Sequence, residues 1–122
     1  VCSSDLASCE EFLILPEATP GSKPSWFGFP ITLKASAPIS RVELLQKLDT
    51  RKVGTRLLFA GNLTRQPYMR GRNFRVSGEL TNTDVVMRDT FWIGVQPALS
   101  EEMMEFAVRA IEDALGIRSL SA

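Results

Sequence analysis

The sequence predicts an α+β domain in which helices cover one face of a small, mostly antiparallel sheet. Short segments of strand type alternate with segments that begin with helix-capping residues. The last third carries an apolar stripe at helical spacing. The composition, 44% hydrophobic and 23% charged over 122 residues, is typical of one folded domain with enough apolar surface for a core.

The first strand and helix are predicted between residues 29 and 54. Residues 29–34 alternate apolar and polar side chains, as a half-buried strand does, and they follow a loop rich in proline and glycine. Ser40 and Glu43 have the spacing of a capping box, which predicts a helix that begins after Ser40. Gly54 is expected to end this helix in the left-handed conformation.

A second strand, a long loop, a short helix and a third strand are predicted next. The second strand is expected over residues 55–60, buried on both faces at its centre, and the loop over residues 61–79. Thr81 is expected to cap a helix that runs to Asp89, and residues 91–95 predict the third strand.

The C-terminal helix has the clearest pattern in the chain. Ser100 is expected to cap it, Gly116 to end it, and Glu105 to pair with Arg109 one turn later. One face of the helix is apolar and is expected to pack on the sheet; it consists of Met104, Ala107, Val108, Ile111, Ala114 and Leu115.

The first six residues, VCSSDL, resemble one reading frame of a sequencing-library adapter, and no methionine precedes them. We therefore expect residues 1–6 to be a processing scar that takes no part in the fold. Cys2 and Cys9 are too few for a disulfide framework, and each is interpreted as an incidental thiol. Since no secretory segment follows, a cytoplasmic location is expected.

The residue inventory excludes several classes of chemistry from this chain. It has no histidine, which removes a serine–histidine triad, a histidine base and every histidine metal site. Two cysteines are too few for a four-thiolate zinc or iron–sulfur site. No apolar run approaches the roughly 18 residues of a membrane span. We expect no catalytic residue, no metal site and no membrane contact within these residues.

Charge is unevenly distributed although the net charge is zero. Residues 50–78 contain seven basic and no acidic side chains, whereas residues 79–122 contain eight acidic and three basic ones. The basic block suggests an anionic partner. The alternative is a solvated loop, or one that pairs with the acidic C-terminal third.

Two segments are candidates for ligand contact. Asn62, Thr64 and Arg65 lie on a loop directly after a predicted strand, a common place for ligand-binding groups, and arginine suits phosphate or carboxylate oxygens. Residues 26–29 contain three aromatic side chains, which either form a wall against a planar ligand or another subunit, or fill the core.

Three phrases resemble one enzyme family: PSWFGFPI at residues 24–31, TRLLFAGNLTRQPYM at 55–69 and LTNTDVVMRDTFWIGVQPALSEEMMEF at 80–106. The resemblance is to the C-terminal end of the lipopolysaccharide dideoxysugar 3-dehydrases, which act on a CDP-4-keto-6-deoxyhexose. These enzymes belong to the DegT/DnrJ/EryC1 sugar-aminotransferase family of fold-type-I pyridoxal-phosphate enzymes.

The resemblance implies that the complete enzyme is longer and that a large N-terminal domain carries the cofactor. In the dehydrase branch a histidine replaces the Schiff-base lysine, so pyridoxamine phosphate is bound without a covalent link. Its amine condenses with the 4-keto sugar, and the C3 hydroxyl leaves. Some members hold an iron–sulfur cluster and take electrons from a separate iron–sulfur flavin reductase. The cofactor site and any such cluster would lie outside this chain.

The resemblance also implies a division of the chain and a set of substrate-binding residues. Residues 7–28 would lead in from the missing large domain, residues 29–116 would form the small domain that closes over the active site and supports a homodimer, and residues 117–122 would be a tail. The substrate-binding residues implied for the nucleotide sugar are Arg56, Asn62, Thr64 and Arg65.

Two other functions compete with this interpretation. A true nucleotide-sugar aminotransferase would share the domain but have an upstream lysine in place of the histidine. A small nucleic-acid-binding module could use the basic block, but residues 61–79 lack the mixed aromatic and basic phrase of RNA-binding sheets, so no nucleic-acid partner is expected. On the dehydrase interpretation, the isolated 122-residue chain is expected to be inactive.

Overall fold

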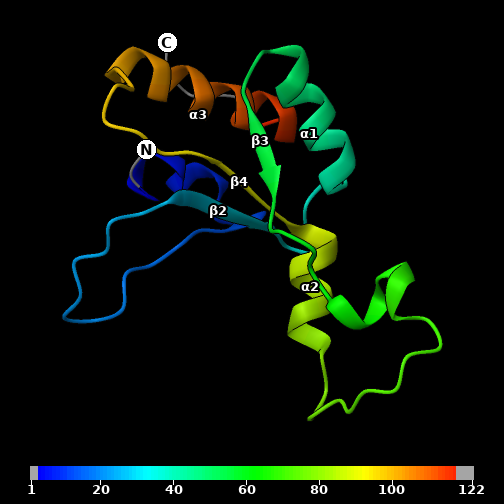
Figure 1. Cartoon of the computed structure of the whole chain (residues 1–122). Helices are drawn as coiled ribbons and strands as arrows, with labels where there is room; N and C mark the ends of the chain where they lie inside the picture. The colour runs from blue at the N-terminus through cyan, green and yellow to red at the C-terminus, as the bar shows by residue number, and fades with distance from the viewer. Residues whose placement is uncertain (1–2, 118–122) are drawn as a thin grey trace.

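The computed structural model describes residues 3–117 and confirms the predicted α+β class (Figure 1). Four strands form one sheet in the order β1-β2-β4-β3, and each neighbouring pair is antiparallel. The strands are β1 (Leu13–Ile14), β2 (Gly28–Leu33), β3 (Thr55–Leu57) and β4 (Thr90–Gly94). The helices are α1 (Arg41–Thr50), α2 (Thr81–Asp89) and α3 (Glu101–Leu115), with 3₁₀ turns η1 (Ser3–Cys9), η2 (Leu63–Arg65) and η3 (Pro67–Met69).

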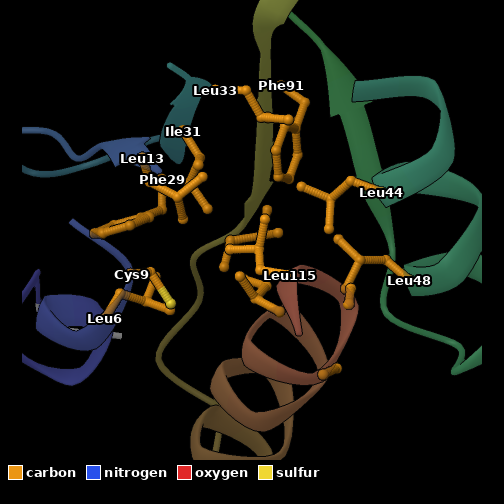
Figure 2. Packing of buried hydrophobic residues seen from close by; sticks show 14 residues of the cluster. Leu6, Cys9, Leu13, Phe29, Ile31, Leu33, Leu44, Leu48, Phe91 and Leu115 are labelled. Carbon is orange, nitrogen blue, oxygen red and sulfur yellow. The ribbon is translucent and has the colours of Figure 1, made fainter. Parts of the chain in front are cut away.

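The core lies between the sheet and the two helices α1 and α3. Side chains alternate along a strand, so Phe29 and Ile31 of β2 and Phe91 and Ile93 of β4 point to the same, buried face. Figure 2 shows the Phe91 ring pointing from β4 into this cluster. The other buried apolar residues are Leu6, Cys9, Leu13, Leu33, Leu44, Leu48, Ala110, Ile111, Ala114 and Leu115.

The start of α1 is confirmed, but its predicted end at Gly54 is wrong. Ser40 and Glu43 make both bonds of the capping box, with the Ser40 N–H donating to Glu43 Oε2 over 2.8 Å. The helix ends at Thr50, and Lys52 takes the left-handed conformation with φ 62°. The amides of Lys52 and Val53 then donate to the last helical carbonyls, which closes the helix two residues before the glycine.

Lys52→Gly is expected to stabilise the chain by about 0.5–1 kcal/mol. A side chain in the left-handed region costs roughly 1–2 kcal/mol, and the added freedom of glycine in the unfolded chain offsets part of that gain. Arg51→Gly is the matched control, because Arg51 has an ordinary φ of −88° and should lose stability instead. Urea unfolding of both variants checks the prediction, and equal losses would contradict it.

The prediction of a buried strand over residues 55–60 is wrong in length and in burial. β3 has three residues, and Arg56 and Leu57 are exposed because β3 is the edge strand of the sheet. Phe59 then adopts a positive φ of 50°, which turns the chain away from the sheet into the loop. The two 3₁₀ turns η2 and η3 lie in this loop.

The N-terminal segment takes part in the fold, contrary to expectation. Leu6 and Cys9 of η1 are fully buried in the core, and η1 packs against α3, where the Ser8 hydroxyl donates to Glu112 Oε1 over 2.6 Å. Excluding residues 1–6 from the fold was therefore wrong for Leu6, although the origin of the hexapeptide stays a prediction. Burial raises the pKa of the Cys9 thiol, and Cys2 lies outside the described residues.

The predicted C-terminal helix is confirmed as α3. The Ser100 hydroxyl accepts the Met103 N–H, and Gly116 ends the helix in the left-handed conformation with φ 74°. The Glu105–Arg109 ion pair forms at 3.5 Å. An ion pair of 2.8 Å between Arg51 and Asp113 ties α3 to the end of α1. The tail residues 118–122 lie outside the described part of the chain.

Helix α2 runs over the predicted residues, but Thr81 is its first helical residue rather than its cap, which is Leu80. No residue of α2 is buried, and the helix lies away from α3, with only its end next to the start of α1 (Figure 1). Arg41 at the start of α1 fixes its end, because the guanidinium donates to the carbonyls of Met87 and Thr90 over 2.7 and 3.0 Å. Among residues 3–117, no helix is long and apolar enough to cross a membrane.

Candidate functional site

Asn62 is the centre of a hydrogen-bonded group on the loop after β3. Its side chain is 2% exposed, and its Oδ1 accepts the backbone N–H of Thr64 over 3.0 Å and the Thr64 hydroxyl over 2.7 Å. Its Nδ2 donates to Asp84 Oδ1 in the first turns of α2 over 2.7 Å. A buried amide with these bonds satisfied holds the loop in one conformation.

Arg65 forms a bidentate ion pair with the same carboxylate. Its Nε donates to Asp84 Oδ1 over 2.6 Å and its Nη2 to Asp84 Oδ2 over 2.5 Å. The bonds from Arg65 and then from Asn62 hold the pKa of Asp84 below its ordinary value, and Asp84 raises the pKa of Arg65. We call Asn62, Thr64, Arg65 and Asp84 the loop network.

Two further contacts fix the entry to this loop. Gly61 has a positive φ of 62°, and a Cβ at that position would lie 2.6 Å from Cβ of Met87 on α2. Gln66 donates from Nε2 to the Ala60 carbonyl over 2.6 Å, which closes the turn on itself. Only glycine fits the close approach of the loop to α2 at residue 61.

Arg56 lies on the other sheet face, which α1 and α3 leave uncovered. It stands opposite Trp92 of β4, and Trp92 stands opposite Pro30 of β2. Trp92 makes edge-on ring contacts with Phe27 at 5.3 Å and with Phe59 at 5.2 Å between centroids.

The aromatic side chains of residues 26–29 therefore lie on both faces of the sheet. Phe29 fills the core, as one interpretation predicted, whereas Phe27 is 81% exposed on the uncovered face. Gly28 is required between them, because a Cβ there would lie 2.9 Å from the Trp92 ring.

The structure brings three of the four sequence-predicted residues together. Asn62, Thr64 and Arg65 belong to the loop network, whereas no hydrogen bond or ion pair within residues 3–117 joins Arg56 to it. Asp84 was missed, because a carboxylate in the first turns of a predicted helix gives no sign of a bond to the preceding loop. One sequence feature could have indicated it: Asp84, the carboxylate of the LTNTD phrase, follows a block of seven basic residues that contains no acidic partner.

The basic block is partly neutralised. Arg51 pairs with Asp113 and Arg65 with Asp84, so the block does pair with the acidic C-terminal third at these two positions. Arg56, Arg70 and Arg75 have no carboxylate partner among the described residues. Positive charge therefore remains on β3 and on the loop, close in sequence to the loop network.

The pKa of Asp84 is a direct test of the network. We expect its pKa to lie below the ordinary Asp value of about 3.9, and Arg65→Ala to raise it. Because the folded pKa is the lower one, the stabilisation is fully present above the ordinary value and is lost as pH falls through the folded value. Carboxyl NMR titration of both proteins measures this. An Asp84 pKa that Arg65→Ala leaves unchanged would show that the ion pair does not form.

A family model described as the DegT/DnrJ/EryC1/StrS aminotransferase family matches residues 1–112. The chain belongs to this family. It is 58% identical over 112 residues to the lipopolysaccharide biosynthesis protein RfbH of Salmonella typhimurium, covering 92% of the chain and 26% of that protein. It is 46% identical over 101 residues to the dTDP-4-dehydro-2,6-dideoxy-D-glucose 3-dehydratase of Saccharopolyspora spinosa, covering 83% of the chain and 22% of that protein.

Solved structures share the fold of this chain. The GDP-4-keto-6-deoxy-D-mannose-3-dehydratase of E. coli, determined with bound hydrated PLP, superposes with a TM-score of 0.75 at 17% identity. The match covers 89% of this chain and 28% of that one. The chain thus spans about a quarter of the length of the relatives it matches, and the α+β architecture is that of a domain within these aminotransferase-fold proteins.

The residues of this chain do not by themselves fit a pyridoxal-phosphate site, which takes a lysine for the Schiff base and a charged partner for the pyridine nitrogen. Of the four lysines, Lys34 and Lys47 donate from their amines to the carbonyls of Glu10 and Ala114, and Lys23 and Lys52 are exposed on loops. We therefore assign no step of that cofactor's chemistry to these residues.

Proposed function

We propose that this chain is the small domain of a nucleotide-sugar 3-dehydrase, a pyridoxamine- or pyridoxal-phosphate enzyme of dideoxysugar synthesis for O-antigen lipopolysaccharide. The name of the 3-dehydratase relative from Saccharopolyspora spinosa supports the reaction, and RfbH supports the lipopolysaccharide context. We call the longer protein in which the chain would act the parent protein.

The single observation that carries the proposal is the contact between two phrases of the sequence. The resemblance to the dehydrases, as distinct from the wider aminotransferase family, depends on the phrases NLTRQP and LTNTD, and their side chains Asn62, Arg65 and Asp84 form one hydrogen-bonded group. Residues that are specific to the dehydrase resemblance are therefore joined in space. This supports a role in handling the substrate that distinguishes the dehydrases.

The substrate-binding residues implied by the resemblance differ in their exposure to solvent. Arg65 is 60% exposed in its side chain, and within residues 3–117 its Nη1 has no protein acceptor. We propose that Arg65, with Thr64 and Arg56, contacts phosphate or sugar oxygens of a nucleotide sugar. Asn62 is buried with its bonds made, so its part in the proposal is to hold Thr64 and the loop in place.

Several properties of the parent protein stay part of the proposal. A homodimer and a cytoplasmic location are expected from the family resemblance and the sequence. An iron–sulfur cluster with a separate iron–sulfur flavin reductase is an option only if the thiolates come from outside this chain, since the chain has two cysteines and a cluster takes four ligands.

Product analysis of the purified parent protein tests the function. With pyridoxamine phosphate, a reductant and CDP-, GDP- or dTDP-4-keto-6-deoxyhexoses, we expect mass spectrometry to detect a sugar that has lost its C3 oxygen. A product in which the 4-keto group has become an amine would establish the aminotransferase alternative instead. The isolated 122-residue chain is the control and should give no turnover, and dehydration by it alone would contradict its role as a small domain.

A further inference from the structure

Asp84 receives three hydrogen bonds from the loop that follows β3, although it lies on a different element. Its Oδ1 accepts from Asn62 Nδ2 and Arg65 Nε, and its Oδ2 accepts from Arg65 Nη2, all between 2.5 and 2.7 Å. We propose that Asp84 is a positioning residue that holds the substrate-binding loop, and Arg65 in particular, in its working orientation. This inference rests on the proposed function, since the loop's substrate is the nucleotide sugar proposed there.

The loop has little else to hold it. Between β3 and α2, Phe59, Leu63 and Tyr68 are all more than half exposed, Phe59 despite its edge-on contact with Trp92, and Asn62 is the only buried residue of the described loop. Apolar packing therefore contributes little to its order. The bonds to Asp84 and the contact of Gly61 with Met87 join the loop to α2 at two residues, 84 and 87, on one face of that helix.

Helix α2 is itself held in place by the sheet, and it thereby fixes the position of Asp84. It has no buried residue, but it runs directly into β4 at Thr90, and Arg41 holds its last carbonyls to the start of α1. The Thr90 hydroxyl also bonds to that of Thr32 on β2 at 2.8 Å. The carboxylate of Asp84 thus connects a rigid sheet to an exposed loop.

The pairing also determines what Arg65 can offer a substrate. With Asp84 bound, the pair has no net charge, and one edge of the guanidinium, made of Nε and Nη2, is already in use. Its outer edge remains, with both N–H groups of Nη1 and the second N–H of Nη2, and the ion pair fixes the direction of that edge. Arg65 would then recognise an oxygen at one position rather than attract any anion, and free rotation would remove that selectivity.

Asp84→Asn in the parent protein tests the proposal. We expect a tenfold to hundredfold fall in kcat/KM for the nucleotide sugar. Combined with Arg65→Ala, it should cause a loss well below the product of the two single losses, because Asp84 acts mainly through the Arg65 guanidinium. Asp84→Glu keeps a carboxylate and should recover part of the activity. Asp89→Asn is the matched control: Asp89 is on the same helix, pairs with Arg88 at 2.6 Å and makes no contact with the loop.

Hydrogen exchange at the Thr64 amide separates this inference from the proposed function. That amide donates to Asn62, so Asp84→Asn should accelerate its exchange while Asp89→Asn should not. Unchanged exchange, additive kinetic losses, or normal kinetics with faster exchange would each overturn the positioning role. A wild-type parent that removes no C3 oxygen refutes the proposed function, and the inference with it, whatever the exchange rates show.

Discussion

Phe91→Ala is expected to lower the free energy of unfolding of the chain by about 3–5 kcal/mol. Phe91 is fully buried on the central strand β4, opposite Ile31 of β2 and Leu57 of β3, and it faces the two helices that cover the sheet. Truncating it leaves a cavity where strands and helices meet. Small domains have roughly 5–15 kcal/mol of stability in total, so this one change removes a large part of it.

The control for Phe91→Ala is the same substitution on the uncovered face. Phe27 is 81% exposed and makes one edge-on contact with Trp92, so Phe27→Ala should cost at most about 1 kcal/mol. Guanidinium chloride unfolding measures the loss of stability in both variants, from the shift of the midpoint at an unchanged m-value. Equal effects would mean that the core does not lie on the α1–α3 face, and the assignment of faces would be wrong.

The helices could be predicted from the sequence because their signals are local. The spacing of Ser40 and Glu43 specifies the start of α1, and Ser100 and Gly116 bound α3. Each cap involves residues within a few positions of one another, so no knowledge of the rest of the fold is needed. The end of α1 was missed because the residue that takes the left-handed conformation is Lys52. A lysine gives no local signal of that conformation, whereas a glycine does.

The errors concern features that depend on distant parts of the chain. Residues 55–60 are apolar enough for a central strand, but the antiparallel order places β3 at the edge, next to β4 only. β1 has two residues and exists through its pairing with β2. The burial of Leu6 depends on contact with α3, about a hundred residues later in the chain. Periodicity cannot reveal such neighbours.

The candidate site was predicted only in part, because one of its residues comes from a distant part of the chain. The loop residues Asn62, Thr64 and Arg65 follow a strand and could be picked out by position and chemistry. Their common partner Asp84 is 22 residues from Asn62, and only the folded chain brings the two together. This partner changes the interpretation of Arg65 from a free cation to an oriented donor.

Arg65→Ala in the parent protein is expected to lower kcat/KM for the nucleotide sugar roughly tenfold to hundredfold, the effect of losing one charge-assisted hydrogen bond. Folding should change little, because the Arg65 side chain is 60% exposed and surface ion pairs contribute little to stability. Arg51→Ala is the matched control, since Arg51 is also a surface arginine in an ion pair, with Asp113 at 2.8 Å, but lies outside the loop network.

The comparison of these two variants tests most directly whether the loop after β3 binds substrate. Steady-state kinetics of the parent protein with its 4-keto sugar nucleotide should show the loss for Arg65→Ala and wild-type values for Arg51→Ala. If Arg65→Ala instead matches Arg51→Ala and the wild type, the arginine is only a surface ion pair, and the loop network is not a substrate site.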